Sequence, residues 1–226
     1  MKFPLASILV IAMLSGCGGS DSPHGALKAM APDEALQALL SGNRRYVDGT
    51  LASRHGVTRR RAELATGQKP FAVIVCCSDS RVGPEVVFDQ GLGDIFVIRT
   101  AGEVVDEIGL ASIEYAVEHL GTTLVVVLGH ERCGAVTAAL AGGEAPGHIG
   151  ALVKAIRPAV EESKGEPGDA LDNAVRAQVR GVVRQLRGST PILSELVHEG
   201  KVEIVGARYD LDTGLVEVVT AETGKH

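Results

Sequence analysis

Short, continuous runs of apolar residues alternate with amphipathic segments along most of the chain, and this alternation restricts the fold more than any other feature. Five such runs occur, at residues 71–76, 95–98, 124–128, 202–207 and 215–219. Apolar runs of this length are typical of strands buried on both faces of a parallel sheet. We therefore expect an α/β domain in which helices flank a mainly parallel central sheet, with right-handed crossovers between strands.

The order of strands and helices can be predicted in more detail. The last two apolar runs are separated only by Asp212-Thr213-Gly214, so we expect an antiparallel hairpin that adds one edge strand to about four parallel strands. Pro32-Asp33-Glu34 is typical of a helix start. Apolar stripes with helical spacing follow at residues 110–120 and 171–186.

Composition excludes some classes of protein. The 226 residues are 45% apolar, which suits one domain with a substantial core. The net charge is −6 and only 3% of residues are aromatic, so a nucleic-acid partner is not expected. Four cysteines are too few for a disulfide scaffold of this size.

The N-terminus has the pattern of a secretory signal. Lys2 precedes an apolar run, residues 3–14, that is too short to span a bilayer. Leu14-Ser15-Gly16-Cys17 resembles the lipobox of bacterial lipoproteins, which implies cleavage after residue 16 and acylation of Cys17. An ordinary signal peptide with an incidental cysteine is the alternative.

A lipoprotein signal would divide the chain into three parts. Residues 1–16 would be removed, residues 17–31 would form the lipidated cysteine and a flexible tether, and residues 32–226 would form the domain. The lipobox resemblance implies a protein of the bacterial cell envelope that faces the periplasm and contacts the membrane only through its lipid. Gly18 resembles the residue found in the outer-membrane sorting class.

Residues suited to metal chemistry follow two of the predicted strands. Cys77 follows the first strand, and His130 and Cys133 follow the third. The carboxyl ends of parallel strands share one edge of the sheet, where ligands gather. Two thiolates and one imidazole favour zinc, and three protein ligands leave the open position of a catalytic site.

Other interpretations of these cysteines are weaker. Cysteines at buried strand ends are commonly packed thiols, and we expect this of Cys76. A redox pair of Cys76 with Cys77 is disfavoured because adjacent strand residues point to opposite faces. A structural zinc site would need a fourth ligand, and Asp79 is the only close candidate.

The two segments together resemble a known family. Cys77-Ser78-Asp79-Ser80-Arg81 and His130-Glu131-Arg132-Cys133-Gly134 are similar to motifs of the β-class carbonic anhydrases. The likeness covers nearly all of the chain from about Pro32 onward. It implies reversible hydration of carbon dioxide to bicarbonate and a proton, by attack of zinc-bound hydroxide, with one Zn²⁺ per subunit. It also implies a homodimer or a dimer of dimers, with the cleft at the subunit interface.

The resemblance also implies roles for individual residues. Cys77, His130 and Cys133 match the zinc ligands, and Asp79 and Arg81 match the catalytic dyad. Asp79 also matches an aspartate that becomes a fourth zinc ligand in the closed form of some relatives. The residues that match substrate-binding positions are Gln68, Phe96, Ala101, Tyr115 and Gly134. Glu103 stands where many relatives have asparagine, and we expect it to change the charge near the cleft.

Two alternative functions remain. A hydrolase of the same fold that acts on carbonyl sulfide or carbon disulfide would share the zinc ligands. A lipid-anchored zinc-binding protein without catalysis would need the metal ligands but would have no use for Gln68, Asp79, Arg81 or Tyr115.

Overall fold

A computed structural model describes residues 30–52 and 57–219 of the chain. The predicted signal peptide, Cys17 and the tether up to residue 29 lie outside the described residues. Within the described ranges, no helix has the length and apolar character needed to cross a bilayer.

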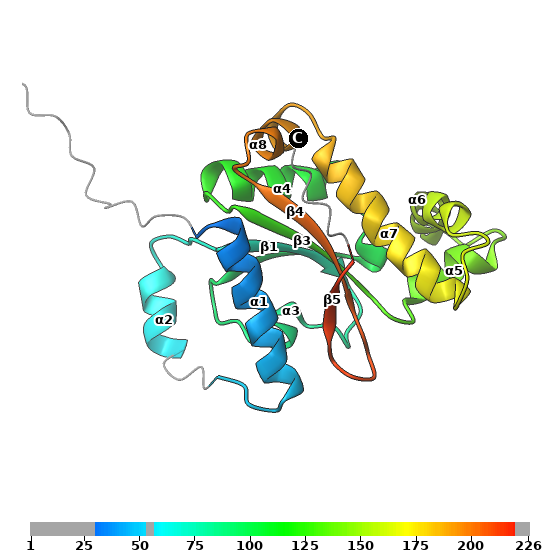
Figure 1. Cartoon of the computed structure of the whole chain (residues 1–226). Coiled ribbons are helices and arrows are strands. Elements are labelled where there is room, and N and C mark those ends of the chain that lie inside the picture. Colours follow the sequence, from blue (N-terminus) through cyan, green and yellow to red (C-terminus); the bar gives the residue numbers. More distant parts are fainter. Residues whose placement is uncertain (1–29, 53–56, 220–226) are drawn as a thin grey trace, which may run out of the picture.

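A five-stranded sheet in the order β2-β1-β3-β4-β5 forms the centre of the molecule (Figure 1). Its strands are β1 (Ala72–Cys77), β2 (Ile95–Thr100), β3 (Leu124–His130), β4 (Glu203–Tyr209) and β5 (Val216–Val218). The first four strands are parallel to their neighbours, and β5 pairs antiparallel with β4. The predicted fold class, with four parallel strands and one antiparallel edge strand, is confirmed.

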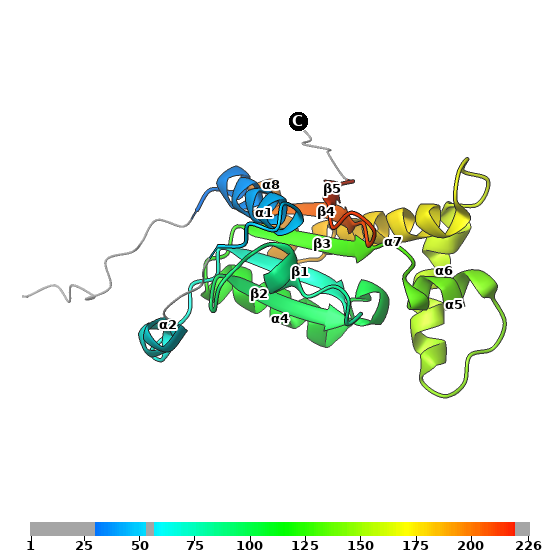
Figure 2. The same ribbon diagram turned by 90° about the horizontal axis from the view of Figure 1, so that it is seen from below.

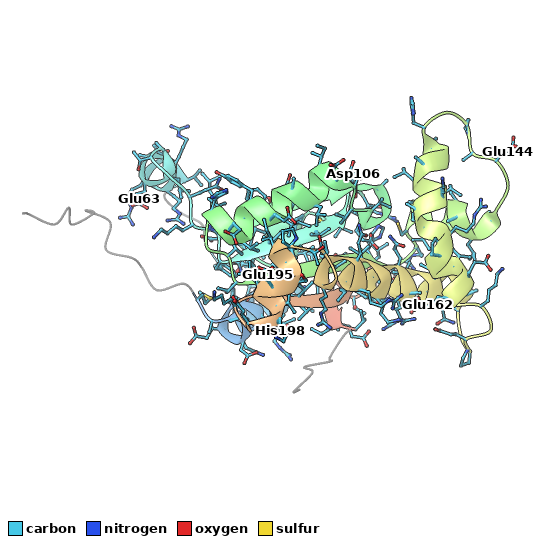
Figure 3. All side chains as sticks on the ribbon, turned by 90° about the horizontal axis from the view of Figure 1, so that it is seen from above. Glu63, Asp106, Glu144, Glu162, Glu195 and His198 are labelled. Carbon is cyan, nitrogen blue, oxygen red and sulfur yellow. The ribbon has the colours of Figure 1, made fainter. Side chains whose placement is uncertain are left out.

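Helices cover both faces of the sheet (Figure 2). They are α1 (Pro32–Val47), α2 (Val57–Leu64), α3 (Pro84–Val87), α4 (Glu107–His119), α5 (Gly134–Ala141), α6 (Ile149–Glu162), α7 (Ala170–Arg187) and α8 (Ile192–His198), with a 3₁₀ turn, η1, at Ala101–Glu103. Side chains of α1 and α3 pack on one face, and those of α4, α7 and α8 pack on the other. Asp106, which caps the N-terminus of α4, and Glu162, at the end of α6, are labelled in Figure 3.

Successive side chains of β1 point to opposite faces of the sheet, and this separates its two cysteines. Val73 and Val75 belong to the core beneath α4, α7 and α8, whereas Ile74 and Cys76 belong to the core beneath α1 and α3. Cys76 is fully buried, which confirms that it is a core residue. The side chain of Cys77 points to the opposite face from that of Cys76 and lies in a third apolar cluster, with residues of α5, α6 and α7.

This third cluster lies at the carboxyl edge of the sheet. The four parallel strands, β1–β4, point toward α5 and α6, which extend the molecule beyond the ends of these strands (Figure 2). Val136 of α5, Ile156 of α6 and Val175 of α7 are buried there beside Cys77 and Cys133. The fold therefore surrounds the end of β1 with apolar side chains on the side where the predicted metal ligands lie.

Candidate metal centre

Three predicted ligands converge at the carboxyl edge of the sheet. Cys77 is the last residue of β1, His130 is the last residue of β3, and Cys133 immediately precedes α5. One donor atom from each lies within 4.8 Å of the other two, and all three residues are buried. The two sulfur atoms are 3.9 Å apart. Strand pairing thus brings together residues that are 56 positions apart in the chain.

The donor set fits a zinc ion. Two Zn–S bonds of about 2.3 Å at a tetrahedral angle place the sulfurs about 3.8 Å apart, which agrees with the observed separation. His130 Nδ1 makes a 2.9 Å hydrogen bond with Glu131 O. His130 Nε2 is buried and has no hydrogen-bond partner among the described residues. This is the usual state of a metal-ligating histidine, with one nitrogen fixed by the backbone and the other available to the ion.

The environment of Cys77 favours the thiolate that a metal binds. The hydrogen bond from Cys133 lowers the pKa of Cys77, and His130 and the backbone N–H of Gly102 lower it further, against the opposing effect of burial. Gly102 N donates to Cys77 Sγ at 3.3 Å. The φ of Gly102 is +67°, and a Cβ added there would lie only 2.7 Å from Ile156 Cδ1. The position that donates this hydrogen bond therefore requires glycine.

The segment that carries His130 and Cys133 is fixed to the β4–β5 hairpin. Glu131 N donates to Tyr209 O at 3.0 Å, and the Glu131 carboxylate accepts from Leu211 N at 3.2 Å. Arg132 donates to both carboxylate oxygens of Asp212, at 3.0 and 2.7 Å. These contacts restrict the backbone on both sides of Glu131, so the two ligands of this segment are held before any metal binds.

Asp79 and Arg81 form a tight pair beside the three ligands. Arg81 Nε and Nη2 donate to the two oxygens of Asp79 at 2.9 and 2.7 Å, and Arg81 N donates to Asp79 Oδ1 at 2.9 Å. The side-chain hydrogen bonds from Arg81 lower the pKa of Asp79 well below its usual value. Asp79 Oδ2 is 3.7 Å from His130 Nε2. We call Cys77, His130 and Cys133 together the metal group. An ionised carboxylate, that of Asp79, therefore lies next to the metal group without belonging to it.

The predicted substrate-binding residues separate into two sets. Ala101 precedes Gly102, and Gly134 follows Cys133, so both lie at the metal group. Phe96 pairs with Val73, four residues before Cys77, which is about 13 Å along the strand.

The other two substrate-binding residues, Gln68 and Tyr115, lie on the surface of the chain. Tyr115 is half exposed in α4, with its ring 5.2 Å from that of His119. Gln68 precedes β1 and lines an open cavity with Gln90 and Ile95, the first residue of β2. Gln68 is therefore at the amino edge of the sheet, and one chain does not bring it to the metal group.

A second acidic group does not resemble a metal site. Glu131, Asp210 and Asp212 offer carboxylate oxygens within 4.8 Å of one another. Arg132 pairs with Asp212, and Arg208 pairs with Asp210 at 3.2 Å. These arginines supply the positive charge that the carboxylates need, and the group serves to connect the hairpin to the ligand segment.

Glu103 does not affect the site as its sequence position suggests. The residue is 1% exposed, and neither carboxyl oxygen has a hydrogen-bond partner among the described residues. Burial raises the pKa of Glu103 well above its ordinary value, and the nearby Cys77 raises it further. The expectation that Glu103 adds charge near the cleft is wrong, because burial favours the neutral acid. No local pattern in the sequence indicates that this glutamate is buried.

Replacing Glu103 with glutamine should change how stability depends on pH. In the native protein the carboxyl stays protonated well above pH 4.5, whereas in the unfolded chain it ionises near that pH, the ordinary pKa of a glutamate. The folded state therefore binds more protons, so this group's contribution to stability is lost as pH rises. The free energy of unfolding of Glu103→Gln, relative to wild type, should increase with pH by up to about 1.4 kcal/mol per unit.

This comparison is made by urea unfolding of the zinc-loaded proteins between pH 5 and pH 8. Glu144→Gln, in the exposed loop between α5 and α6 (Figure 3), is the control and should show the same pH dependence as wild type. A difference between Glu103→Gln and wild type that stays constant over this range would contradict the prediction.

Comparisons with known proteins agree with this geometry. Residues 72–216 match the family model described as carbonic anhydrase. The chain is 44% identical over 187 residues to carbonic anhydrase 2 of Mycobacterium tuberculosis, covering 81% of this chain and 90% of the relative. It is 41% identical over 191 residues to a carbonic anhydrase of Mycolicibacterium smegmatis, covering 83% and 93%.

Solved structures give the same result. A tetrameric β-carbonic anhydrase from Sordaria macrospora superposes with a TM-score of 0.67 and 26% sequence identity, covering 81% of this chain and 95% of that chain. The family match, the relatives and the shared fold all include both ligand-bearing strands. The chain therefore belongs to the β-class carbonic anhydrase family.

Proposed function

We propose that Cys77, His130 and Cys133 hold the zinc ion with which this protein hydrates carbon dioxide, and that Asp79 and Arg81 are its catalytic dyad. The observation that carries the proposal is the convergence of two sulfurs and an unpartnered imidazole nitrogen within 4.8 Å, beside an ionised carboxylate. Zinc, when bound, is a Lewis acid that lowers the pKa of water toward about 7.

Asp79 and Arg81 act on the reacting oxygen. Asp79 Oδ2 lies on the His130 side of the pair, where it accepts a hydrogen bond from the attacking oxygen and directs a lone pair toward carbon dioxide. Arg81 keeps Asp79 ionised and fixes its rotamer through two side-chain hydrogen bonds. The same pairing holds the carboxylate away from the position of a fourth ligand. We assign Ala101 and Gly134, the chain neighbours of Gly102 and Cys133, to the lining of the space beside the metal group.

The function is tested by measuring zinc content together with stopped-flow hydration of carbon dioxide. The expected result is one zinc ion per subunit and hydration well above the buffer rate. Carbonyl sulfide and carbon disulfide are assayed in parallel, since a hydrolase of the same fold would prefer them. Zinc-loaded protein that hydrates carbon dioxide no faster than buffer would contradict the proposal and favour a zinc-binding protein without catalysis.

Removing Arg81 should favour an inactive arrangement of the site. In Arg81→Ala the pKa of Asp79 rises toward its ordinary value, and the free carboxylate is able to turn toward the metal as a fourth ligand. We expect hydration to fall by about 10- to 100-fold with zinc retained, and the pH profile to shift. Activity and pH profile equal to those of wild type would contradict this role. Arg180→Ala, which removes an arginine of α7 from exposed ion pairs with Glu162 and Glu166, is the control.

We propose further that the protein works as a homodimer or a dimer of dimers in which Gln68 serves the cleft of the partner. Gln68 is exposed at the amino edge of the sheet, away from the metal group of its own chain. Helix α2 has no buried residue, and on this side of the molecule Val57 of α2 is 60% exposed and Leu92, which lines the same cavity as Gln68, is 51% exposed, so apolar surface is available to a second copy. The tetrameric relative from Sordaria macrospora supports the assembly.

Mixing two inactive variants tests whether Gln68 acts across subunits. Asp79→Ala and Gln68→Ala are each expected to be impaired as homo-oligomers. In a hybrid dimer, one cleft lacks both residues and the other contains both, so activity should return on mixing. If Gln68 served its own subunit, each cleft of the hybrid would lack one residue, and activity would stay low.

We also propose that the mature protein is a lipoprotein of the bacterial envelope. The apolar run after Lys2 and the lipobox-like Leu14-Ser15-Gly16-Cys17 support cleavage before Cys17, lipidation of that residue and a periplasm-facing location, with the outer membrane favoured by Gly18. Cell fractionation of wild type and Cys17→Ser tests this. Wild type should sediment with membranes and carry an acylated N-terminal peptide, and full-length unacylated protein in both would contradict it.

A further inference from the structure

Arg99 binds the backbone of the segment that contains the catalytic dyad. Its Nε donates to Cys77 O at 3.0 Å. Its Nη2 lies 2.9 Å from Cys77 O, 2.7 Å from Asp79 O and 2.9 Å from Val82 O. One guanidinium therefore contacts three carbonyl oxygens within six residues of chain.

The position of Arg99 on the edge strand explains this geometry. Arg99 is the residue before the end of β2 and pairs with Cys76 in the parallel register. Beyond Cys77 the chain leaves the sheet and turns, with Val82 N bonded to Asp79 O at 3.1 Å. The turn brings the carbonyls of Cys77, Asp79 and Val82 to the same side, where Arg99 donates to all three. The planar, multi-donor guanidinium can satisfy all three, whereas an ammonium group is a single point of charge.

Both members of the dyad lie inside the held segment. Asp79 is bound through its own carbonyl, and Arg81 lies between Asp79 and Val82, whose carbonyl is also bound. The segment also begins at the ligand Cys77. Arg99 does not contact the carboxylate of Asp79 in any of these hydrogen bonds, so its effect on the reacting groups is through the backbone.

We propose that Arg99 is a positioning residue, which fixes the Cys77–Val82 segment so that the Asp79–Arg81 pair faces the metal group in one orientation. The proposal rests on the function proposed above, because it assigns Arg99 a role in the same site. A residue that only stabilised the fold would, when removed, weaken the whole sheet. Without Arg99 we expect the Cys77–Val82 segment to become mobile, while the sheet stays folded and the metal group still binds zinc.

Hydrogen exchange of the zinc-loaded protein tests the mechanical part of the proposal without reference to activity. In Arg99→Ala, the backbone amides of Ser78, Arg81 and Val82 should exchange at least about tenfold faster than in wild type. Amides within β1, from Val73 to Cys76, should be unchanged. Exchange at the segment equal to that in wild type would overturn the proposal, and so would faster exchange throughout the sheet.

Kinetics and zinc content test the functional part. We expect Arg99→Ala to retain one zinc ion per subunit and to lose about 10- to 100-fold in kcat, with a smaller change in KM. Guanidinium ion at millimolar concentration should restore part of the kcat of Arg99→Ala by occupying the vacated space. Arg99→Lys keeps the positive charge but lacks the planar guanidinium, so its kcat should lie between those of wild type and Arg99→Ala. This variant replaces Arg99→Ala in the tests if the alanine variant does not fold.

The control is Arg180→Ala. Arg180, in α7, forms exposed ion pairs with Glu162 and Glu166, and its removal should leave kcat, zinc content and hydrogen exchange unchanged. Loss of zinc in Arg99→Ala, or a kcat equal to that of wild type, would overturn the proposal. Neither result would affect the assignment of carbon dioxide hydration, which is judged on the wild-type protein alone.

Discussion

Replacing Cys77 with alanine is expected to remove zinc and carbon dioxide hydration together, whereas the same change at the adjacent Cys76 should preserve both. Cys77 supplies one of two sulfurs 3.9 Å apart at the carboxyl edge of the sheet. Without it, one thiolate and one imidazole remain, which is too small a donor set for tight zinc binding. We expect zinc content to fall from about one per subunit to below about 0.1, and hydration to fall to the buffer rate.

Cys76 is a closely matched control because it is the same residue type, one position away and also buried. Its side chain lies in the core beneath α1 and α3, and burial raises the pKa of its thiol to about 12. Cys76→Ala should therefore lose only packing, about 1–2 kcal/mol of stability, and keep its zinc and its activity. Zinc retained in Cys77→Ala, or zinc lost in Cys76→Ala with the fold intact, would contradict the assignment of ligands.

The second large effect is expected for Asp79→Ala. The carboxylate is not among the three ligands, so zinc content should remain at one per subunit. Loss of the group that accepts a hydrogen bond from the reacting oxygen should lower kcat by about 10²- to 10⁴-fold. Asp79→Asn, which keeps the shape but not the charge, should be impaired to a similar degree. The measurements are metal analysis and stopped-flow hydration of the same preparations.

A matched carboxylate control separates the chemical effect from a general change of charge. Glu166 is exposed in the loop between α6 and α7, where it pairs with Arg180, so Glu166→Ala should hydrate carbon dioxide at the wild-type rate. If Asp79→Ala lost zinc, Asp79 would have to be a ligand of the resting site. If it kept zinc and full activity, the dyad would have no role in the reaction.

The sheet and the long helices could be predicted because their patterns are determined locally. The runs that form β1, β3 and β4 are apolar on both faces, and α1, α4 and α7 show apolar stripes over 13 to 18 residues. The elements that periodicity did not identify are α3, α5, α6 and α8. Helices α3, α5 and α8 have only 4, 8 and 7 residues, too few to establish a helical period. Helix α6 contains Pro158, which is unfavourable inside a helix.

The metal group could be predicted because parallel pairing brings the ends of β1 and β3 to one edge. The residues that support it could not. Arg99 contacts three carbonyls only after the turn from Cys77 to Val82 has formed, and the burial of Glu103 depends on how α7 packs over η1. Gln68 resembles a cleft residue in sequence, yet it lies at the other edge of the same sheet. Such placements follow from tertiary structure and assembly, which no local pattern contains.

The most direct test of the account is zinc X-ray absorption spectroscopy of the purified wild-type protein. The account predicts two sulfur scatterers at about 2.3 Å and nitrogen or oxygen scatterers at about 2.0–2.1 Å, the shell that Cys77, Cys133 and His130 would provide with one further light atom. A shell of four sulfurs, or a shell with no sulfur, would contradict it.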